Sequence, residues 1–109
     1  MESPDEVVVT GWGCVSPLGE NTETTWSRLV AGDWARVPIS CIPVEGCRVV
    51  EGAQAELPDL AWLPKKSVSR LSRAARLALP AAREALLDAG ILGANGRSVF
   101  PRLEMSLST

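Results

Sequence analysis

The sequence predicts an α/β fold in which helices cover both faces of a β-sheet. Three observations support this: a β-branched run at residues 7–10, a glycine-rich loop at 11–19, and two later segments with the apolar spacing of helices. The chain has 109 residues, of which 46% are apolar and 22% are charged. This composition fits one small globular domain with a single core.

The first predicted element is a strand at residues 7–10 (Val-Val-Val-Thr), which Gly11 closes. A continuous run of this kind is typical of a central strand that is covered on both faces. Residues 11–19 contain three glycines and one proline, so we expect a loop with unusual backbone angles.

A first helix is predicted after this loop. Asn21 is a suitable N-cap, and the apolar residues Trp26, Leu29 and Val30 lie on one helical face. Gly32 is placed to end the helix.

Four prolines divide residues 33–64 into short pieces, and only residues 47–55 have the pattern of a strand. We expect it in an antiparallel or edge position, weakened or bulged at Gly52.

A second helix is predicted over residues 69–89, with Gly90 as its stop. Pro80 interrupts the pattern and is expected to kink the helix or to divide it in two. One stripe of mostly small residues predicts tight packing against another helix or a sheet; it consists of Leu71, Ala75, Ala78, Ala82, Leu86 and Ala89.

The reactive residue types restrict the possible chemistry. The chain has three cysteines, Cys14, Cys41 and Cys47, and no histidine. An odd, irregular set of cysteines is a poor disulfide framework and does not form a paired zinc motif. Without histidine, no Ser-His or Cys-His couple can form within the chain. We therefore expect buried or partly buried reduced thiols, no catalytic residue, no metal and no cofactor.

A dinucleotide-binding function is disfavoured, although residues 7–13 superficially resemble such a fingerprint. Ser16 stands where that motif needs Gly or Ala, and residues 17–20 intervene before the helix.

Charge and hydropathy indicate the surroundings of the protein. The longest apolar stretches are much shorter than the roughly 20 residues that cross a bilayer, and Glu2, Asp5 and Glu6 stand where a signal peptide would be basic. We expect a soluble, cytoplasmic chain that binds neither a membrane nor nucleic acid.

Three blocks of residues together resemble the amino-terminal part of the β-ketoacyl synthases, the condensing enzymes of fatty acid and polyketide synthesis. The first is Val7-Val8-Val9-Thr10-Gly11-x-Gly13-x-x-Ser16-Pro17-x-Gly19, and the second is Trp26-x-x-Leu29-x-x-Gly32. The third is the alanine-rich stretch from Ser72 to Gly90. The blocks follow one another in the order and at the separations of the family.

The resemblance implies an amino-terminal fragment of a thiolase-like αβαβα layered fold, with a first central strand, a helix, a short antiparallel strand and an alanine-rich helix. We expect a frayed terminus at 1–5, a synthase-like segment at 6–97 and a divergent tail at 98–109, where Pro101 interrupts the expected strand. Ser72, Pro80 and the segment 33–35 also depart from the family pattern.

The resemblance further implies decarboxylative condensation of an acyl thioester with a malonyl group on acyl carrier protein. The family's nucleophilic Cys, two His and Lys lie further along its longer chains. Cys14 lacks the Thr-Ala-Cys context of that nucleophile. The expected function is therefore a truncated synthase that is inactive alone, and its complete relatives form homodimers.

The alternative is a non-catalytic module that binds acyl carrier protein or a synthase subunit. All six charged residues of the segment 65–83 are basic, whereas residues 1–64 have three basic and ten acidic residues. An acidic carrier protein could dock on this positive segment. The expected docking face is formed by Arg70, Arg73, Arg76 and Arg83; a merely solvated helix face would explain the same charges.

Overall fold

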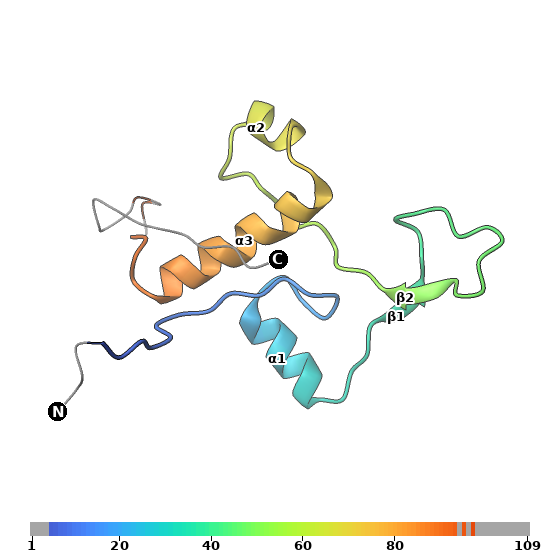
Figure 1. Cartoon of the computed structure of the whole chain (residues 1–109), viewed down its shortest axis with the longest axis horizontal. Coiled ribbons are helices and arrows are strands. Elements are labelled where there is room, and N and C mark those ends of the chain that lie inside the picture. Colours follow the sequence, from blue (N-terminus) through green and yellow to red (C-terminus); the bar gives the residue numbers. More distant parts are fainter. Residues whose placement is uncertain (1–4, 94, 96, 98–109) are drawn as a thin grey trace.

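The computed structural model describes residues 5–93, 95 and 97 of the chain (Figure 1). Helices and a small antiparallel sheet both occur, in agreement with an amino-terminal piece of an α/β protein. The elements in chain order are α1 (Thr22–Val30), β1 (Arg36–Pro38), β2 (Glu51–Ala53), α2 (Lys65–Ser69) and α3 (Arg73–Asp88).

Helix α1 begins and ends where the sequence predicts. The side chain of Asn21 accepts a hydrogen bond from the backbone N–H of Thr24 at 2.8 Å. At the other end Gly32 has φ +80°, and the N–H of Asp33 donates to the carbonyl of Arg28 at 3.0 Å. This pattern of hydrogen bonds around a left-handed glycine is a Schellman motif, which satisfies the last carbonyls of the helix.

The second helix predicted over residues 69–89 is α3, and its first boundary was wrong, because residues 70–72 lie between α2 and α3. Helix α2 ends at Ser69, and α3 starts after Ser72, whose side chain accepts from the N–H of Ala75 at 3.2 Å. Gly90, with φ +74°, ends α3 as expected, and the N–H of Ile91 reaches the carbonyl of Leu86 at 2.9 Å.

Pro80 does not divide helix α3, which runs without a break from Arg73 to Asp88. Proline removes one helical hydrogen bond and costs about 3 kcal/mol in a helix interior. The residues around it are mostly Ala, Leu and Arg, which are strong helix formers. The hydrogen bonds that Glu84 and Asp88 accept from the loop at residues 11–19 also favour a continuous helix.

Strands β1 and β2 form a short antiparallel hairpin, which confirms the predicted antiparallel position. Strand β2 is shorter than the stretch predicted at residues 47–55. The register pairs Arg36 with Ala53, Val37 with Gly52 and Pro38 with Glu51. Gly52 thus sits in regular pairing, and the expected bulge at this glycine was wrong. Within the predicted stretch 47–55, only Glu51–Ala53 is a strand. The chain turns at the start of this stretch, where the N–H of Cys47 donates to the carbonyl of Val44.

Residues 7–10 do not form the predicted strand. They carry no strand pairing and are exposed, with Val7 at 95% and Val9 at 78% of their full accessible surface. A strand is stabilised by hydrogen bonds to a neighbouring strand. Among the described residues, no segment pairs with residues 7–10 in this way. The β-branched composition alone is therefore insufficient to form a strand here.

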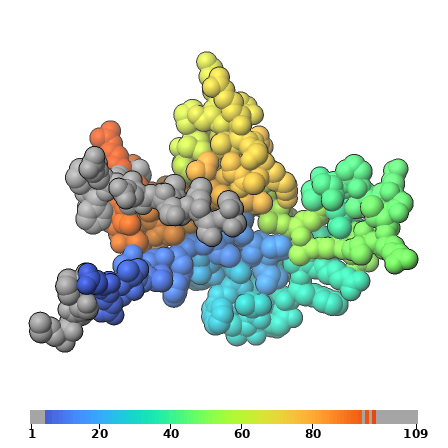
Figure 2. Space-filling view, viewed as in Figure 1, coloured from blue at the N-terminus to red at the C-terminus, as the bar shows by residue number. Residues whose placement is uncertain are grey.

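The described residues bury little apolar surface. Leu60, at 7% exposure, is their one buried apolar residue. The radius of gyration is 17.2 Å, against about 13 Å for a compact domain of roughly 100 residues. Figure 2 shows the β1–β2 lobe and helix α2 projecting from the body of the molecule. The exposed large apolar residues are Val7, Val8, Val9, Trp12, Trp26, Leu29, Val30, Trp34, Val37, Ile42, Val49, Val50, Leu57 and Trp62.

Candidate functional site

The glycine loop lies directly on the alanine-rich helix and passes between α1 and α3 (Figure 1). A Cβ atom added to Gly11 would lie 2.5 Å from the backbone nitrogen of Ala89, and one added to Gly13 would overlap the carbonyl oxygen of Ala81. Both distances are shorter than side-chain carbons tolerate, so glycine is required at these two positions. The predicted close approach of α3 is confirmed, but the expected partner was wrong, because α3 packs against the glycine loop instead of a helix or a sheet.

Two carboxylates of α3, one helical turn apart, hold this loop in place. Glu84 accepts the backbone N–H of Cys14 at 2.8 Å, and Asp88 accepts that of Trp12 at 3.2 Å. Because the N–H groups of alternate loop residues meet carboxylates on the same helix face, the loop is fixed along the helix rather than at one point.

Glu84 also binds the start of helix α1. Its two carboxylate oxygens each lie 3.1 Å from the backbone nitrogen of Thr22, and one of them accepts the Thr22 hydroxyl at 2.9 Å. A negative charge at a helix N-terminus is favourable because the first N–H groups are unpaired within the helix. The donors that a phosphate would use at this helix end are thus occupied by Glu84 and Asn21.

The far end of the loop is closed by a tight turn. Ser16 and Gly19 exchange two backbone hydrogen bonds, of 2.9 and 3.1 Å, around Pro17 and Leu18. The Ser16 hydroxyl lies 2.8 Å from that of Thr25 on α1. The loop is therefore fastened to both helices, which makes it the most interconnected part of the described chain.

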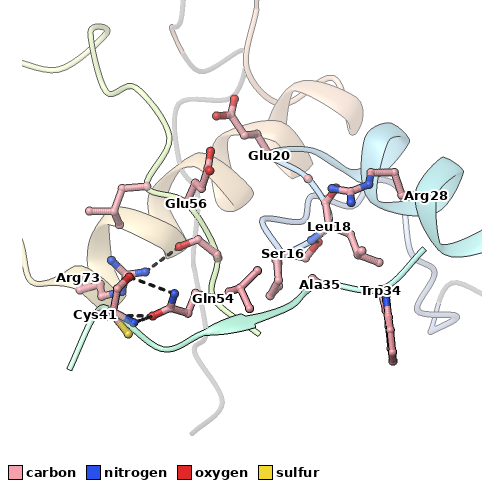
Figure 3. A pocket seen from close by; sticks show the side chains of 16 residues that line it. Ser16, Leu18, Glu20, Arg28, Trp34, Ala35, Cys41, Gln54, Glu56 and Arg73 are labelled. Carbon is pink, nitrogen blue, oxygen red and sulfur yellow. Dashed lines mark hydrogen bonds between the residues drawn. The ribbon is translucent and has the colours of Figure 1, made fainter. Parts of the chain in front are cut away.

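A groove of about 730 Å³ opens beside this turn (Figure 3). Glu20 and Glu56 approach it from different segments, and Arg28 is held at its edge by Asp33 at 3.2 Å and by the Leu18 carbonyl at 3.0 Å. Gln54 joins the two arms of the β1–β2 hairpin beside this groove, because its side-chain oxygen accepts the N–H groups of Ser40 and Cys41 at 2.9 and 2.8 Å. No nucleophile in this lining has a basic side chain as hydrogen-bond partner.

The three cysteines are free and lie apart from one another in the structure. Cys41 and Cys47 are exposed in the hairpin loop, so the expectation of buried or partly buried thiols was wrong for these two. Cys14 is partly buried, and its sulfur lies 3.9 Å from the hydroxyl oxygen of Thr25. Within the described ranges, no three metal-ligating side chains gather, and no helix is long and apolar enough to cross a membrane.

Three of the four arginines of the expected docking face lie on α3, Arg70 follows α2, and the three on α3 make contacts within the chain. Arg73 donates to the carbonyl of Ala55 at 2.7 Å, and Arg76 donates to that of Val68 at 3.1 Å. The guanidinium of Arg83 lies 5.1 Å from the ring centroid of Trp62. These arginines hold the segment that precedes α3 against the helix. Arg70 is exposed.

Sequence reasoning missed Glu84, Asp88 and Gln54 as the residues that join the segments. A signal for the first two was present in the sequence. Both acidic residues lie on the last turns of the alanine-rich stretch, four positions apart, near the small residues that predicted a close approach. The side chain of Gln54 had no such signal, because its partners depend on how the hairpin closes.

Comparison with known proteins gives a consistent match. Residues 4–100 match the family described as "Beta-ketoacyl synthase, N-terminal domain". The chain is 36% identical over 92 residues to 3-oxoacyl-[acyl-carrier-protein] synthase 2 of Rhizobium meliloti, which covers 77% of this chain and 22% of the relative. It is 37% identical over 92 residues to the ketoacyl synthase beta subunit of the tetracenomycin polyketide synthase of Streptomyces glaucescens, covering 84% of this chain and 22% of that protein.

A third relative, 3-oxoacyl-[acyl-carrier-protein] synthase 2 of Staphylococcus aureus, is 33% identical over 90 residues, with 82% of this chain and 22% of the relative covered. The chain thus spans about a fifth of the length of the curated relatives it matches. The matched residues 4–100 include the glycine loop, α1 and α3, which the structure brings together around Glu84. This chain belongs to the β-ketoacyl synthase family, and its residues 4–100 match the family's amino-terminal domain.

Proposed function

We propose that this chain is the amino-terminal scaffold of a condensing enzyme, and that the reacting groups of that enzyme are supplied by residues outside it. One observation carries the proposal: the three family blocks meet in a single contact, in which Glu84 binds both the glycine loop at Cys14 and helix α1 at Thr22. A scaffold of this kind positions a sheet and a helix without taking part in bond formation.

The proposed reaction is the decarboxylative condensation of the family, in fatty acid or polyketide synthesis. An acyl group is held as a thioester on a cysteine, a malonyl group on acyl carrier protein loses carbon dioxide, and the carbanion attacks the acyl carbonyl. The chain has no histidine to stabilise that carbanion, and the side-chain contact found for the Cys14 sulfur is with the hydroxyl of Thr25, which is not a base. By itself it is therefore expected to be inactive.

In the complete enzyme, residues 7–10 would join a parallel central sheet of a layered αβαβα fold, in the cytoplasm. Exposure of three consecutive valines supports this part of the proposal, because a strand of this composition is stable only when both faces are covered. The exposed apolar face of α1, with Trp26, Leu29 and Val30, would be covered by the same remaining part.

A chimera tests the scaffold function. The matched amino-terminal segment of the Rhizobium meliloti synthase is replaced by residues 4–100 of this chain, and the β-ketoacyl product is measured by mass spectrometry. We expect condensation above the background of the same relative without its amino-terminal segment. A chimera that folds, as shown by cooperative unfolding, but makes no product would overturn the proposal.

A non-catalytic module that binds acyl carrier protein or a synthase subunit is the second candidate. The observation that favours it is the basic segment 65–83, in which Lys65, Lys66 and Arg70 are exposed. Substitution of Lys66 and Arg70 by Glu should weaken binding of an acidic carrier protein at low salt. Arg48→Glu is the matched control, since it is exposed in a different lobe. Equal affinity of all variants would exclude this face as a docking surface.

A further inference from the structure

Residues 55–71, which we call the strap, run beside helix α3 and are fastened to it by three arginines (Figure 1). Arg73 and Arg76 donate to strap carbonyls at 2.7 and 3.1 Å, and the guanidinium of Arg83 lies 5.1 Å from the centroid of a strap indole ring. These arginines are spaced three and seven positions apart and so lie on one helix face. Leu60, the one buried apolar residue of the described part, also belongs to the strap.

The strap has little secondary structure of its own to keep it in place. Its helix α2 has five residues and buries no side chain, and a helix this short does not persist in water without tertiary contacts. The other backbone hydrogen bonds found within the strap join close neighbours, such as the N–H of Leu63 and the carbonyl of Leu60 at 2.9 Å. Release of the strap from α3 would therefore expose its amides to solvent.

One donor beneath the strap has no acceptor. The Nε atom of Arg76 is buried and makes no hydrogen bond within the described part of the chain. The Nη2 atom of the same guanidinium donates to Val68, so this group lies against the strap. Among the described residues, no carboxylate forms an ion pair with Arg76. A buried donor of a charged group without an acceptor is unfavourable, so the closed position of the strap is opposed by this atom.

Opening of the strap changes what Arg76 can bind. In the closed position Nη2 is bonded to Val68 and Nε is covered. In the open position both donors are free, and a guanidinium can then bind two oxygens of one carboxylate or phosphate group. A ligand that binds one of two conformations shifts the population toward that conformation. An oxyanion paired with Arg76 therefore favours the open strap.

We propose that the strap is an anion-released switch, in which an oxyanion that pairs with Nε and Nη2 of Arg76 frees residues 55–71 from helix α3. The contact between the glycine loop, α1 and α3 stays closed, because the partners of Glu84 and Asp88 lie outside the strap. The switch is independent of the proposed scaffold function. It also differs from simple attraction of an acidic partner to the exposed basic residues, which requires no movement of the chain.

Amide hydrogen exchange of the full chain, followed by mass spectrometry, tests the switch. The anion is chloride, acetate or inorganic phosphate, at one pH and one ionic strength. Exchange of residues 60–71 should increase about threefold when acetate or phosphate is present at twice its dissociation constant. Exchange of Thr24 and Thr25 in α1 should not increase. The direction is diagnostic, because phosphate otherwise strengthens apolar burial and slows exchange.

The two oxyanions distinguish the possible sources of the ligand. An increase with acetate shows that a carboxylate is sufficient, and an increase with phosphate alone identifies a phosphate group. Both results support the switch. If neither anion speeds exchange of the strap relative to chloride, or if α1 responds as strongly as the strap, the proposal is overturned. This comparison uses the unmodified chain and so does not depend on the folding of any variant.

Arg76→Lys tests which side chain senses the anion. Lysine keeps the positive charge and can donate to the carbonyl of Val68, but it has no second donor fixed beside the first. The increase in exchange should be lost in this variant. Arg70→Lys is the matched control, because Arg70 is exposed and its side chain fastens no part of the strap; it should respond as the unmodified chain does. An equal response of Arg76→Lys and Arg70→Lys would contradict the role of Arg76.

Discussion

Glu84 on helix α3 accepts the backbone N–H of Thr22, the first residue of α1 and 62 positions earlier in the chain, at 3.1 Å. The same carboxylate accepts the N–H of Cys14 in the glycine loop at 2.8 Å. One side chain thus satisfies donors from two segments that are distant in sequence. Without it, the contact between the three family blocks would depend on the close packing of Gly11 and Gly13 and on the hydrogen bonds of Trp12 with Asp88 and of Ser16 with Thr25.

Glu84→Ala should destabilise this contact, because it leaves the N–H groups of Cys14 and Thr22 without their acceptor. The expected loss in the free energy of unfolding is about 1–3 kcal/mol. Glu84→Gln should lose less, since its amide oxygen can still accept. Glu20→Ala, at an exposed carboxylate without a hydrogen bond, is the control. Urea denaturation measures all three, and equal stability of Glu84→Ala and Glu20→Ala would contradict the role of Glu84.

Gly13→Ala should destabilise the chain by about 1–3 kcal/mol, as overpacking does. Its Cβ would overlap the carbonyl oxygen of Ala81, which belongs to the helix backbone and cannot turn aside. Gly52→Ala is the matched control, because its Cβ would meet only the flexible side chain of Ile39 at 3.4 Å. Thermal unfolding should show a lower midpoint temperature for Gly13→Ala and an unchanged midpoint temperature for Gly52→Ala. A tolerated Gly13→Ala would mean that the loop does not lie on α3.

Pro80→Ala should stabilise helix α3. The substitution restores an N–H that can donate to the carbonyl of Arg76, and alanine is about 3 kcal/mol more favourable than proline in a helix interior. The net gain is smaller, because alanine also gives the unfolded chain more freedom. Far-ultraviolet circular dichroism should report increased helicity and a higher unfolding midpoint. A lower unfolding midpoint for Pro80→Ala would show that the Pro80 ring makes packing contacts that stabilise the chain.

The exposed apolar residues should make the chain bind a hydrophobic dye and self-associate. Val7, Val8 and Val9 form a strand-like run without a partner, and unpaired runs of this kind promote edge-to-edge association. Sedimentation velocity should show mass increasing with concentration. Val8→Lys should reduce this association by placing a charge in the run. A chain that stays monomeric and binds no dye at any concentration would contradict the exposure of these apolar residues.

The parts of the fold that depend on local sequence could be predicted, and those that depend on distant segments could not. Asn21, Gly32 and Gly90 mark helix ends through their own backbone and side-chain chemistry, and all three are confirmed. The run at 7–10 has the composition of a strand, but pairing requires a neighbouring strand, and the described residues offer none.

The same distinction applies to the candidate site. The small-residue stripe predicted a close approach of this helix, and its member Ala89 does lie against Gly11, but the contacts with Ala81 and Ala85 lie outside the predicted stripe. The role of Glu84 could not be read from its own neighbours, because its partners lie 62 and 70 positions away. The basic segment was visible as charge alone, whereas the contacts that Arg73 and Arg76 make depend on the path of residues 55–68.

The proposal that the catalytic residues of this enzyme lie beyond the present chain has one direct test. The DNA that follows the codon for Thr109 is sequenced and translated in every frame. A Thr-Ala-Cys segment followed by later histidine-containing segments of the family is the predicted result. A stop codon with no such segments in any frame would contradict the proposal and favour the module that binds a carrier protein or a synthase subunit.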